Sequence, residues 1–221
     1  MPLHNSSSIL NHIDFYKHRA KNVDLIWCGQ IINLLNEITS KNKKYSINDI
    51  GCNYGQLYKE IKRNKLEKRY DYFGYDHDDK FLDIARENFK ELKNKIQILD
   101  IEKETPPSAD ITICSAVFEH LDNPIQGLSH IFNCTTEHII LRTWVGLDDV
   151  RFIQSDSRFV DQPYNVNQYG LFEMSEKFFN GGFNFTCIPD HATDMSKKYE
   201  VFKGSGINRQ MYILLGSRNE K

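Results

Sequence analysis

The stretch that decides the fold reads Ser46-Ile47-Asn48-Asp49-Ile50-Gly51-Cys52-Asn53-Tyr54-Gly55. It predicts a short strand that passes through an acid into a turn with two glycines, and then into a helix. Glycine lets the backbone approach a ligand closely, and the first turn of a helix offers unpaired N–H groups. The stretch therefore indicates a nucleotide cofactor site.

Strand and helix patterns alternate after this turn. Further strands are predicted at 72–75, 96–99, 110–114 and 138–143, and apolar residues at helical spacing lie between them. This alternation favours right-handed crossovers and a mostly parallel sheet with helices on both faces. Two last strands, 183–188 and 210–215, have no helical pattern between them and indicate a C-terminal antiparallel hairpin. The expected fold is a doubly wound α/β fold with seven strands.

Two helix starts are marked by capping residues. Asp78 or Asp79 can cap the helix that follows the second strand, and Asn123 followed by Pro124 is typical of another helix start. Both helices are therefore expected to begin close to a strand end.

With 221 residues, the chain is long enough for one large α/β domain. We expect an N-terminal extension and helix at 1–45, acting as a cap or lid, and the main domain at 46–221. Residues 1–21 are polar, so no ordered structure is expected there unless a ligand or partner provides it. The segment 144–171 is polar, aromatic and weakly periodic, and such a long insertion is usually functional.

Composition argues against several classes of protein, although a local basic patch stays open. The net charge of −2 gives no general attraction to nucleic acid or to anionic membranes, and no apolar run approaches the length of a membrane span. The five cysteines form no CxxC pair, which favours free thiols and a reducing compartment. We therefore expect a cytoplasmic protein. No two histidines have the spacing of a helix-borne metal site, and no metal is expected.

Acids stand at or near the ends of three successive predicted strands. They are Asp49, Asp76 and Asp100. In an open α/β sheet, ligands bind beyond the carboxyl ends of the strands. Three carboxylates would repel a pyrophosphate but would suit a cationic adenosine ligand.

At this point the sequence resembles the class I S-adenosylmethionine-dependent methyltransferases. Their strand–acid–G-x-G-x-G turn is matched by Asp49, Gly51, Asn53 and Gly55. Asn53 replaces the middle glycine, and asparagine is one of the few residues that adopt a positive φ at modest cost. After the fourth strand comes Ser115-Ala116-Val117-Phe118-Glu119-His120-Leu121, and an E-H-L ending is frequent in the small-molecule branch of the family. The resemblance covers about residues 46–143 and the final hairpin.

The resemblance implies a Rossmann-like methyltransferase fold with S-adenosyl-L-methionine as cofactor. Asp76 takes the place of the family's ribose-binding acid and Asp100 that of its adenine-side acid. The full set of implied cofactor contacts is Asp49, Gly51, Asn53, Tyr54, Gly55, Asp76, His77, Asp100, Ile101, Ser115 and Ala116.

Methyl transfer from a sulfonium is an in-line displacement, in which the protein aligns donor and acceptor and excludes water. A general base helps most when the acceptor is a hydroxyl. His120 is the first candidate for this base because histidine titrates near neutral pH, and Glu119 and His191 are weaker candidates.

The acceptor pocket is expected to come from the insertion, and its aromatic and amide side chains suit transfer to an O or N atom of a small polar metabolite or sugar. The proposed acceptor contacts are Trp144, Tyr164, Asn167 and Tyr169, with Tyr16 and Arg19 closing over them.

Two alternatives remain at this point. The first alternative to a small-molecule O- or N-methyltransferase is a non-catalytic subunit that keeps the fold for binding, because the family needs no obligatory catalytic side chain. A nicotinamide-dependent oxidoreductase is disfavoured, since Gly51-x-Asn53-x-Gly55 lacks the G-x-G-x-x-G spacing and Asp49 would lie near phosphate.

Overall fold

The structure is a computed structural model that describes residues 13–154, 163–194, 200, 203–208 and 210–219. Its strands are β1 (Tyr45–Ile50), β2 (Tyr70–Asp76), β3 (Ile96–Ile98), β4 (Ala109–Ser115), β5 (Thr135–Gly146), β6 (Val150–Gln154), β7 (Tyr164–Gly170), β8 (Phe183–Pro189) and β9 (Met211–Arg218). Its α-helices are α1 (Ile13–Asn22), α2 (Ile26–Ile38), α3 (Gln56–Arg63), α4 (Asp79–Asn88), α5 (Pro124–Cys134), α6 (Leu171–Asn180) and α7 (His191–Asp194). Two short 3₁₀ turns are η2 (Lys90–Leu92) and η3 (Phe118–His120).

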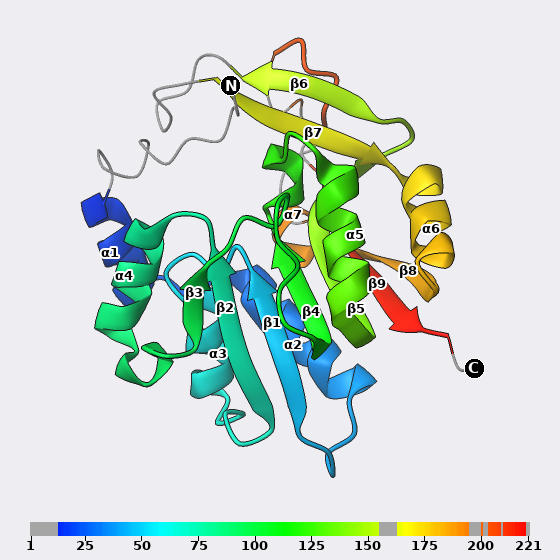
Figure 1. Ribbon diagram of the computed structural model, residues 1–221. Coiled ribbons are helices and arrows are strands. Elements are labelled where there is room, and N and C mark those ends of the chain that lie inside the picture. Colours follow the sequence, from blue (N-terminus) through cyan, green and yellow to red (C-terminus); the bar gives the residue numbers. More distant parts are fainter. Residues whose placement is uncertain (1–12, 155–162, 195–199, 201–202, 209, 220–221) are drawn as a thin grey trace.

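Five parallel strands form the body of the sheet in the order β3-β2-β1-β4-β5 (Figure 1). The strand order reverses between β1 and β4, where the chain crosses to the other side of the first strand. In an open α/β sheet this switch point is where ligands bind. The predicted doubly wound, mostly parallel α/β fold is confirmed.

The C-terminal strands are antiparallel, as the sequence predicts. β9 pairs with β5, with Leu214 opposite Leu141, and β8 pairs antiparallel with β9. β9 therefore lies inside the sheet and β8 forms its edge.

The insertion 144–171 contains two strands that the sequence analysis does not predict. β6 and β7 pair antiparallel, and β7 continues parallel to the last residues of β5, with Tyr169 opposite Val145. The described sheet thus has nine strands instead of the expected seven. The pair projects beyond the carboxyl end of β5, at the top of Figure 1.

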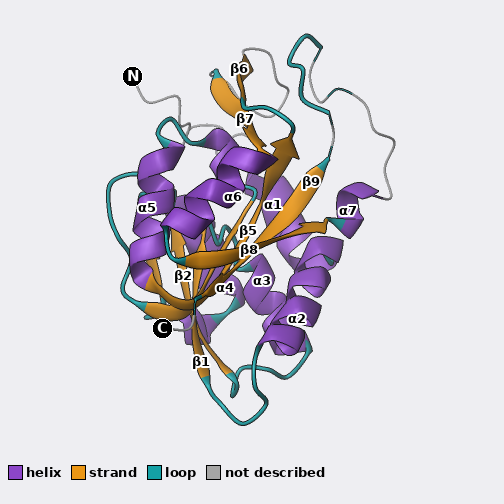
Figure 2. Ribbon diagram, turned by 90° about the vertical axis from the view of Figure 1, so that its right-hand side faces the viewer, coloured by secondary structure: helices purple, strands orange, loops and turns teal. Residues whose placement is uncertain are grey.

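Helices cover both faces of the sheet (Figure 2). On one face, Ile31 of α2, Leu57 of α3 and Leu82 of α4 pack in one apolar cluster with the strands. On the other face, Leu128 of α5 and Phe178 of α6 belong to a second cluster. The apolar residues that recur at helical spacing in the sequence form the faces with which these helices pack on the sheet. Among the described helices, none is long and apolar enough to cross a membrane.

The helix α1 lies in the segment for which no order was expected without a ligand or partner. It packs beside α4 (Figure 1), and the ring of Tyr16 contacts the rings of Phe81 and Tyr54 at centroid distances of 5.0 and 6.4 Å. Tyr54 belongs to the glycine turn. The expected extension therefore touches the predicted cofactor site, whereas its first residues, 1–12, lie outside the described residues.

The glycine turn after β1 has three residues in the left-handed region, namely Gly51 (φ 71°), Asn53 (φ 52°) and Gly55 (φ 78°). The amides of Gly51 and Cys52 both donate to the carbonyl oxygen of Tyr75, at 2.7 and 2.9 Å. The turn is thereby tied to the end of β2. A Cβ on Gly51 would lie 2.1 Å from Cγ2 of Val117, so glycine also admits the segment after β4.

The substitution Gly51→Ala should lower the free energy of unfolding by about 2–4 kcal/mol, because it forces alanine into a left-handed conformation and against Val117. Gly29→Ala is the matched control. Gly29 lies in α2, and a Cβ added there would meet no atom within 4 Å, so helix propensity should raise stability by about 0.5–1 kcal/mol. Urea denaturation measures both. Equal stability of Gly51→Ala and the wild type would contradict this account of the turn.

Candidate functional site

The carboxylate of Asp76 is fixed by the glycine turn. The amide of Asn53 donates to Oδ2 at 2.8 Å, and the amide of Asp78 donates to Oδ1 at 3.1 Å. The half-exposed ring of His77 places Nδ1 3.4 Å from Oδ1. Asn53 also accepts the amide of Tyr54 on its side chain at 2.8 Å. Asn53 therefore takes the middle position of the turn without disrupting it.

Asp49 is buried at the end of β1 and accepts a hydrogen bond from the hydroxyl of Tyr72 at 2.7 Å. Burial raises the pKa of Asp49 to about 7, the Tyr72 hydroxyl opposes this rise, and the nearby Asp76 adds to it. A cation bound here would favour the ionised carboxylate. Tyr72 is not among the site residues predicted from the sequence, although its position four residues before Asp76 puts both side chains on the same face of β2.

Asp100 follows β3 at the same edge of the sheet, because Ile98 pairs with Asp76 in the register of β2 and β3. Its side chain accepts the amide of Glu102 at 3.0 Å and lies 2.7 Å from Nζ of Lys103. Ile101 is buried, and its carbonyl oxygen is bound by Nδ1 of His130 at 2.7 Å. The two acids assigned to ribose and adenine thus end neighbouring strands.

The segment after β4 bends sharply at Ala116, which has a φ of 57° although it is not glycine. Its amide donates to the carbonyl oxygen of Arg142 at 2.9 Å. The Ser115 hydroxyl next to it is buried and has no hydrogen-bond partner within the described part of the chain. A buried hydroxyl without a partner is costly, so Ser115 fits a polar group of a bound ligand.

His120 ends η3, and its Nδ1 lies 2.8 Å from the carbonyl oxygen of Asn165 in β7. A carbonyl oxygen only accepts, so Nδ1 carries the proton and the lone pair of a neutral ring is on Nε2. The ring of Tyr164 lies 5.6 Å away, centroid to centroid. Sequence patterns carry no signal for the Asn165 contact, because any residue type supplies a backbone carbonyl.

The weaker base candidates, Glu119 and His191, have different surroundings. Glu119 is buried and accepts a hydrogen bond from the Thr143 hydroxyl at 3.0 Å. His191 is exposed at the start of α7, where its amide donates to the Gln30 side chain at 2.9 Å.

The predicted acceptor residues fall into two groups. Trp144, at the carboxyl end of β5, and Tyr164 are half-buried. Asn167 and Tyr169 are buried in β7, where the Asn167 amide donates to the carbonyl oxygen of Leu121 at 3.0 Å and the Tyr169 hydroxyl donates to that of Phe118. The second pair therefore faces the protein interior and holds the segment that carries His120.

Tyr16 and Arg19 both lie on α1, near the glycine turn. Burial raises the pKa of Tyr16, and the guanidinium of Arg19 opposes this effect. Burial also raises the pKa of Tyr54 to about 12, again opposed by Arg19. The structure therefore brings these two residues to the turn and not to β7.

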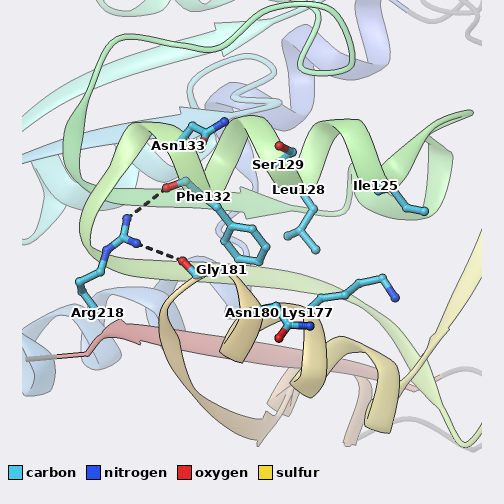
Figure 3. A pocket seen from close by; sticks show the side chains of 9 residues that line it. All are labelled: Ile125, Leu128, Ser129, Phe132, Asn133, Lys177, Asn180, Gly181 and Arg218. Atoms are coloured by element: carbon cyan, nitrogen blue, oxygen red, sulfur yellow. Dashed lines mark hydrogen bonds between the residues drawn. The ribbon is translucent and has the colours of Figure 1, made fainter.

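A separate cavity of about 580 Å³ opens between α5 and α6 (Figure 3). Arg218 at its rim donates to the carbonyl oxygens of Phe132 and Gly181, each at 3.1 Å (Figure 3). The cavity contains none of the predicted site residues; its lining consists of Ile125, Leu128, Ser129, Phe132, Asn133, Lys177, Asn180, Gly181 and Arg218. Over the described residues, no group of three or more potential metal ligands gathers.

Part of the chain matches a known protein domain. Residues 48–138 match a family model described as a methyltransferase domain. This segment spans β1 to the first part of β5, including the glycine turn, the three strand-end acids and His120. A comparison with curated proteins found no match.

Solved structures of similar fold share little sequence identity with the chain. An S-adenosylmethionine-dependent methyltransferase from Clostridium acetobutylicum is 14% identical, with 98% of this chain and 100% of that chain covered and a TM-score of 0.63. Magnesium protoporphyrin IX methyltransferase from Synechocystis with bound SAM is 14% identical, with 98% of each chain covered and a TM-score of 0.62. The N-terminal domain of EvdMO1, crystallised in the presence of SAH and D-fucose, is 13% identical, with 90% of this chain and 84% of that chain covered and a TM-score of 0.62.

The raised pKa of Asp49 makes stability depend on pH. The folded state binds this proton more tightly than the unfolded chain, so the contribution of Asp49 is fully present below the unfolded value of 3.8 and is lost as the pH rises to about 7. In that window the free energy of unfolding of the wild type should fall relative to Asp49→Asn by up to about 1.4 kcal/mol per pH unit. Urea denaturation of both proteins across the window tests this. Parallel pH profiles would contradict a proton held by Asp49.

Proposed function

We propose that the chain is a class I S-adenosylmethionine-dependent methyltransferase that transfers a methyl group to an O or N atom of a small polar acceptor such as a sugar or metabolite, because residues 48–138 match a methyltransferase domain. The observation that carries the proposal is the attachment of Asp76 to the glycine turn through the Asn53 amide at 2.8 Å. This contact fixes an acid at the switch point of the sheet, where an adenosine ligand would bind.

The residues at this edge fit the cofactor. Asp76 would accept both ribose hydroxyls, and Asp100 would accept from the adenine amino group. Asp49 would face the ammonium group of the methionine part, where a positive charge offsets the cost of its burial. The unpartnered hydroxyl of Ser115 would gain a polar partner. The walls would be completed by Gly51, Tyr54, Gly55, His77, Ile101 and Ala116.

S-adenosylmethionine, when bound, supplies an electrophilic methyl group on a sulfonium. The protein then has to orient the acceptor, exclude water and manage one proton. His120 is suited to the last task, because the Asn165 carbonyl holds the proton on Nδ1 and leaves Nε2 to accept one from a hydroxyl or ammonium group of the acceptor.

The acceptor would lie near His120, with Tyr164 and Trp144 as aromatic walls. The half-buried ring of Tyr164 beside His120 suits the apolar face of a sugar or of a small ring. A similarly folded domain crystallised in the presence of D-fucose supports this class of acceptor. Tyr16 and Arg19 would close the site from α1. The buried side chains of β7 would act indirectly, through the segment that bears His120.

The ribose assignment predicts that Asp76→Ala weakens S-adenosylhomocysteine binding by about 30-fold or more, since it removes two hydrogen bonds to a charged acceptor. Isothermal titration calorimetry measures the affinity. Asp71→Ala is the control, because Asp71 lies at the other end of β2 in an ion pair with Lys95 and should leave affinity unchanged. A folded Asp76→Ala protein with wild-type affinity would refute the assignment.

The base assignment predicts that His120→Gln lowers turnover by about 10²–10⁴-fold while S-adenosylhomocysteine affinity is retained. Turnover is followed as S-adenosylhomocysteine release with a panel of sugars, hydroxylated metabolites and amines. The control His138→Gln changes a histidine that bonds to Ser217 in β9, and its activity should stay near that of the wild type. Unaltered turnover in His120→Gln would contradict the assignment of His120 as the base and would leave it a structural role only.

A further inference from the structure

The strand β7 presents three polar side chains on one face to the segment Phe118–Asp122, which we call the His120 segment. Asn165, Asn167 and Tyr169 alternate along the strand, so they point the same way. Their partners are carbonyl and carboxylate oxygens of the His120 segment: Leu121 and Asp122 for Asn165, Leu121 for Asn167, and Phe118 for Tyr169.

The His120 segment has little support of its own. Its regular structure is limited to η3, in which the His120 amide donates to the Val117 carbonyl oxygen at 2.8 Å and the Leu121 amide to that of Phe118 at 3.2 Å. A single 3₁₀ turn has poor hydrogen-bond geometry and is not stable alone. The segment is therefore fixed by the rest of the fold: by the side chains of β7, by the burial of Phe118 and Leu121, and by the hydrogen bond from Thr143 to Glu119.

The position of β7 is itself fixed from its other end. Gly170 donates its amide to the Asp149 side chain at 2.7 Å, and the side-chain amide of Gln168 donates to the carbonyl oxygen of Asp148 at 3.2 Å. Gly146 of β5 leaves room for this side chain, because a Cβ there would lie 2.1 Å from Nε2 of Gln168. The strand is thus held in register against the end of β5.

From these contacts we propose that Asn167 and Tyr169 are positioning residues for His120. They hold the His120 segment against β7, so that the Asn165 carbonyl stays 2.8 Å from Nδ1 and the lone pair stays on Nε2. The insertion 144–171 then contributes to the reaction by setting the tautomer of His120, in addition to any contact that it makes with the acceptor. This inference rests on the proposed role of His120 as a base.

The burial of these side chains agrees with such a role. Asn167 is fully buried, so the hydrogen bond from its side-chain amide to the carbonyl oxygen of Leu121 is shielded from water and costly to lose. The Tyr169 ring packs on Phe118 at a centroid distance of 6.0 Å, and the guanidinium of Arg151 lies 5.7 Å from the centre of the Tyr169 ring. Removing the Tyr169 hydroxyl would leave this packing in place and delete its bond to Phe118 together with its interaction with the Asn167 side chain.

The test is NMR of the full chain with ¹⁵N-labelled histidine, above neutral pH, where two-bond ¹H–¹⁵N spectra show which ring nitrogen carries the proton. The His120 signals are assigned by their absence in His120→Gln. In the wild type we expect the Nδ1–H form to predominate. In Tyr169→Phe and Asn167→Leu, the ratio of Nε2–H to Nδ1–H should rise about fivefold, the effect of weakening one hydrogen bond.

Tyr58→Phe is the matched control, since it removes a hydroxyl that bonds to Glu91 in η2, far from β7 in the sheet, and it should keep the wild-type ratio. If Asn167→Leu does not fold, Tyr169→Phe decides, because it changes one hydroxyl only. A folded Tyr169→Phe protein with the wild-type ratio overturns the inference. The spectra need neither cofactor nor acceptor, so this result is independent of whether S-adenosylhomocysteine binds or a methyl group is transferred.

Discussion

The structure depends on one constraint, the left-handed turn that joins the end of β1 to the end of β2. Backbone amides of the turn bind the Tyr75 carbonyl and the Asp76 carboxylate, and the missing Cβ of Gly51 admits Val117 from the segment after β4. Three strand ends are therefore brought together at one short stretch of backbone. Any ligand held at the switch point relies on this arrangement.

The second feature of the site is that its two sides, along the carboxyl edge of the sheet, are built from different kinds of contact. On the β1–β2–β3 side, acids and a glycine turn form the surroundings expected for a cationic adenosine ligand. On the β4–β5 side, the insertion fixes His120 through side chains that donate to main-chain oxygens. The cofactor half is built from short-range motifs, and the half around His120 from contacts between residues 45 to 51 positions apart.

This difference explains what could be predicted from sequence. The parallel core, the cap residues Asp78 and Asn123 and the left-handed turn follow local rules of spacing and residue type, and the structure has them. The strands β6 and β7 were missed because polar residues occupy inward-facing positions of β7, Asn167 above all. Residues 166–170 are all buried, so no alternation of buried and exposed positions marks this strand, and the burial of Asn167 is possible only because a carbonyl oxygen of another segment receives its hydrogen bond.

The helix α1 was missed for a similar reason. Its sequence is polar, so the apolar periodicity that marks a helix is weak. Its contacts with the rest of the chain include those of the Tyr16 ring with Tyr54 and Phe81, and such contacts between distant residues leave no local pattern.

The most direct test of the site is a backbone amide NMR titration of the wild-type protein with S-adenosylhomocysteine. We predict saturable binding, with the largest shifts at the turn and at the ends of β2, β3 and β4, including Asn53, His77, Ile101 and Ala116. Absence of binding would contradict this prediction. So would binding whose largest shifts fall on the cavity between α5 and α6.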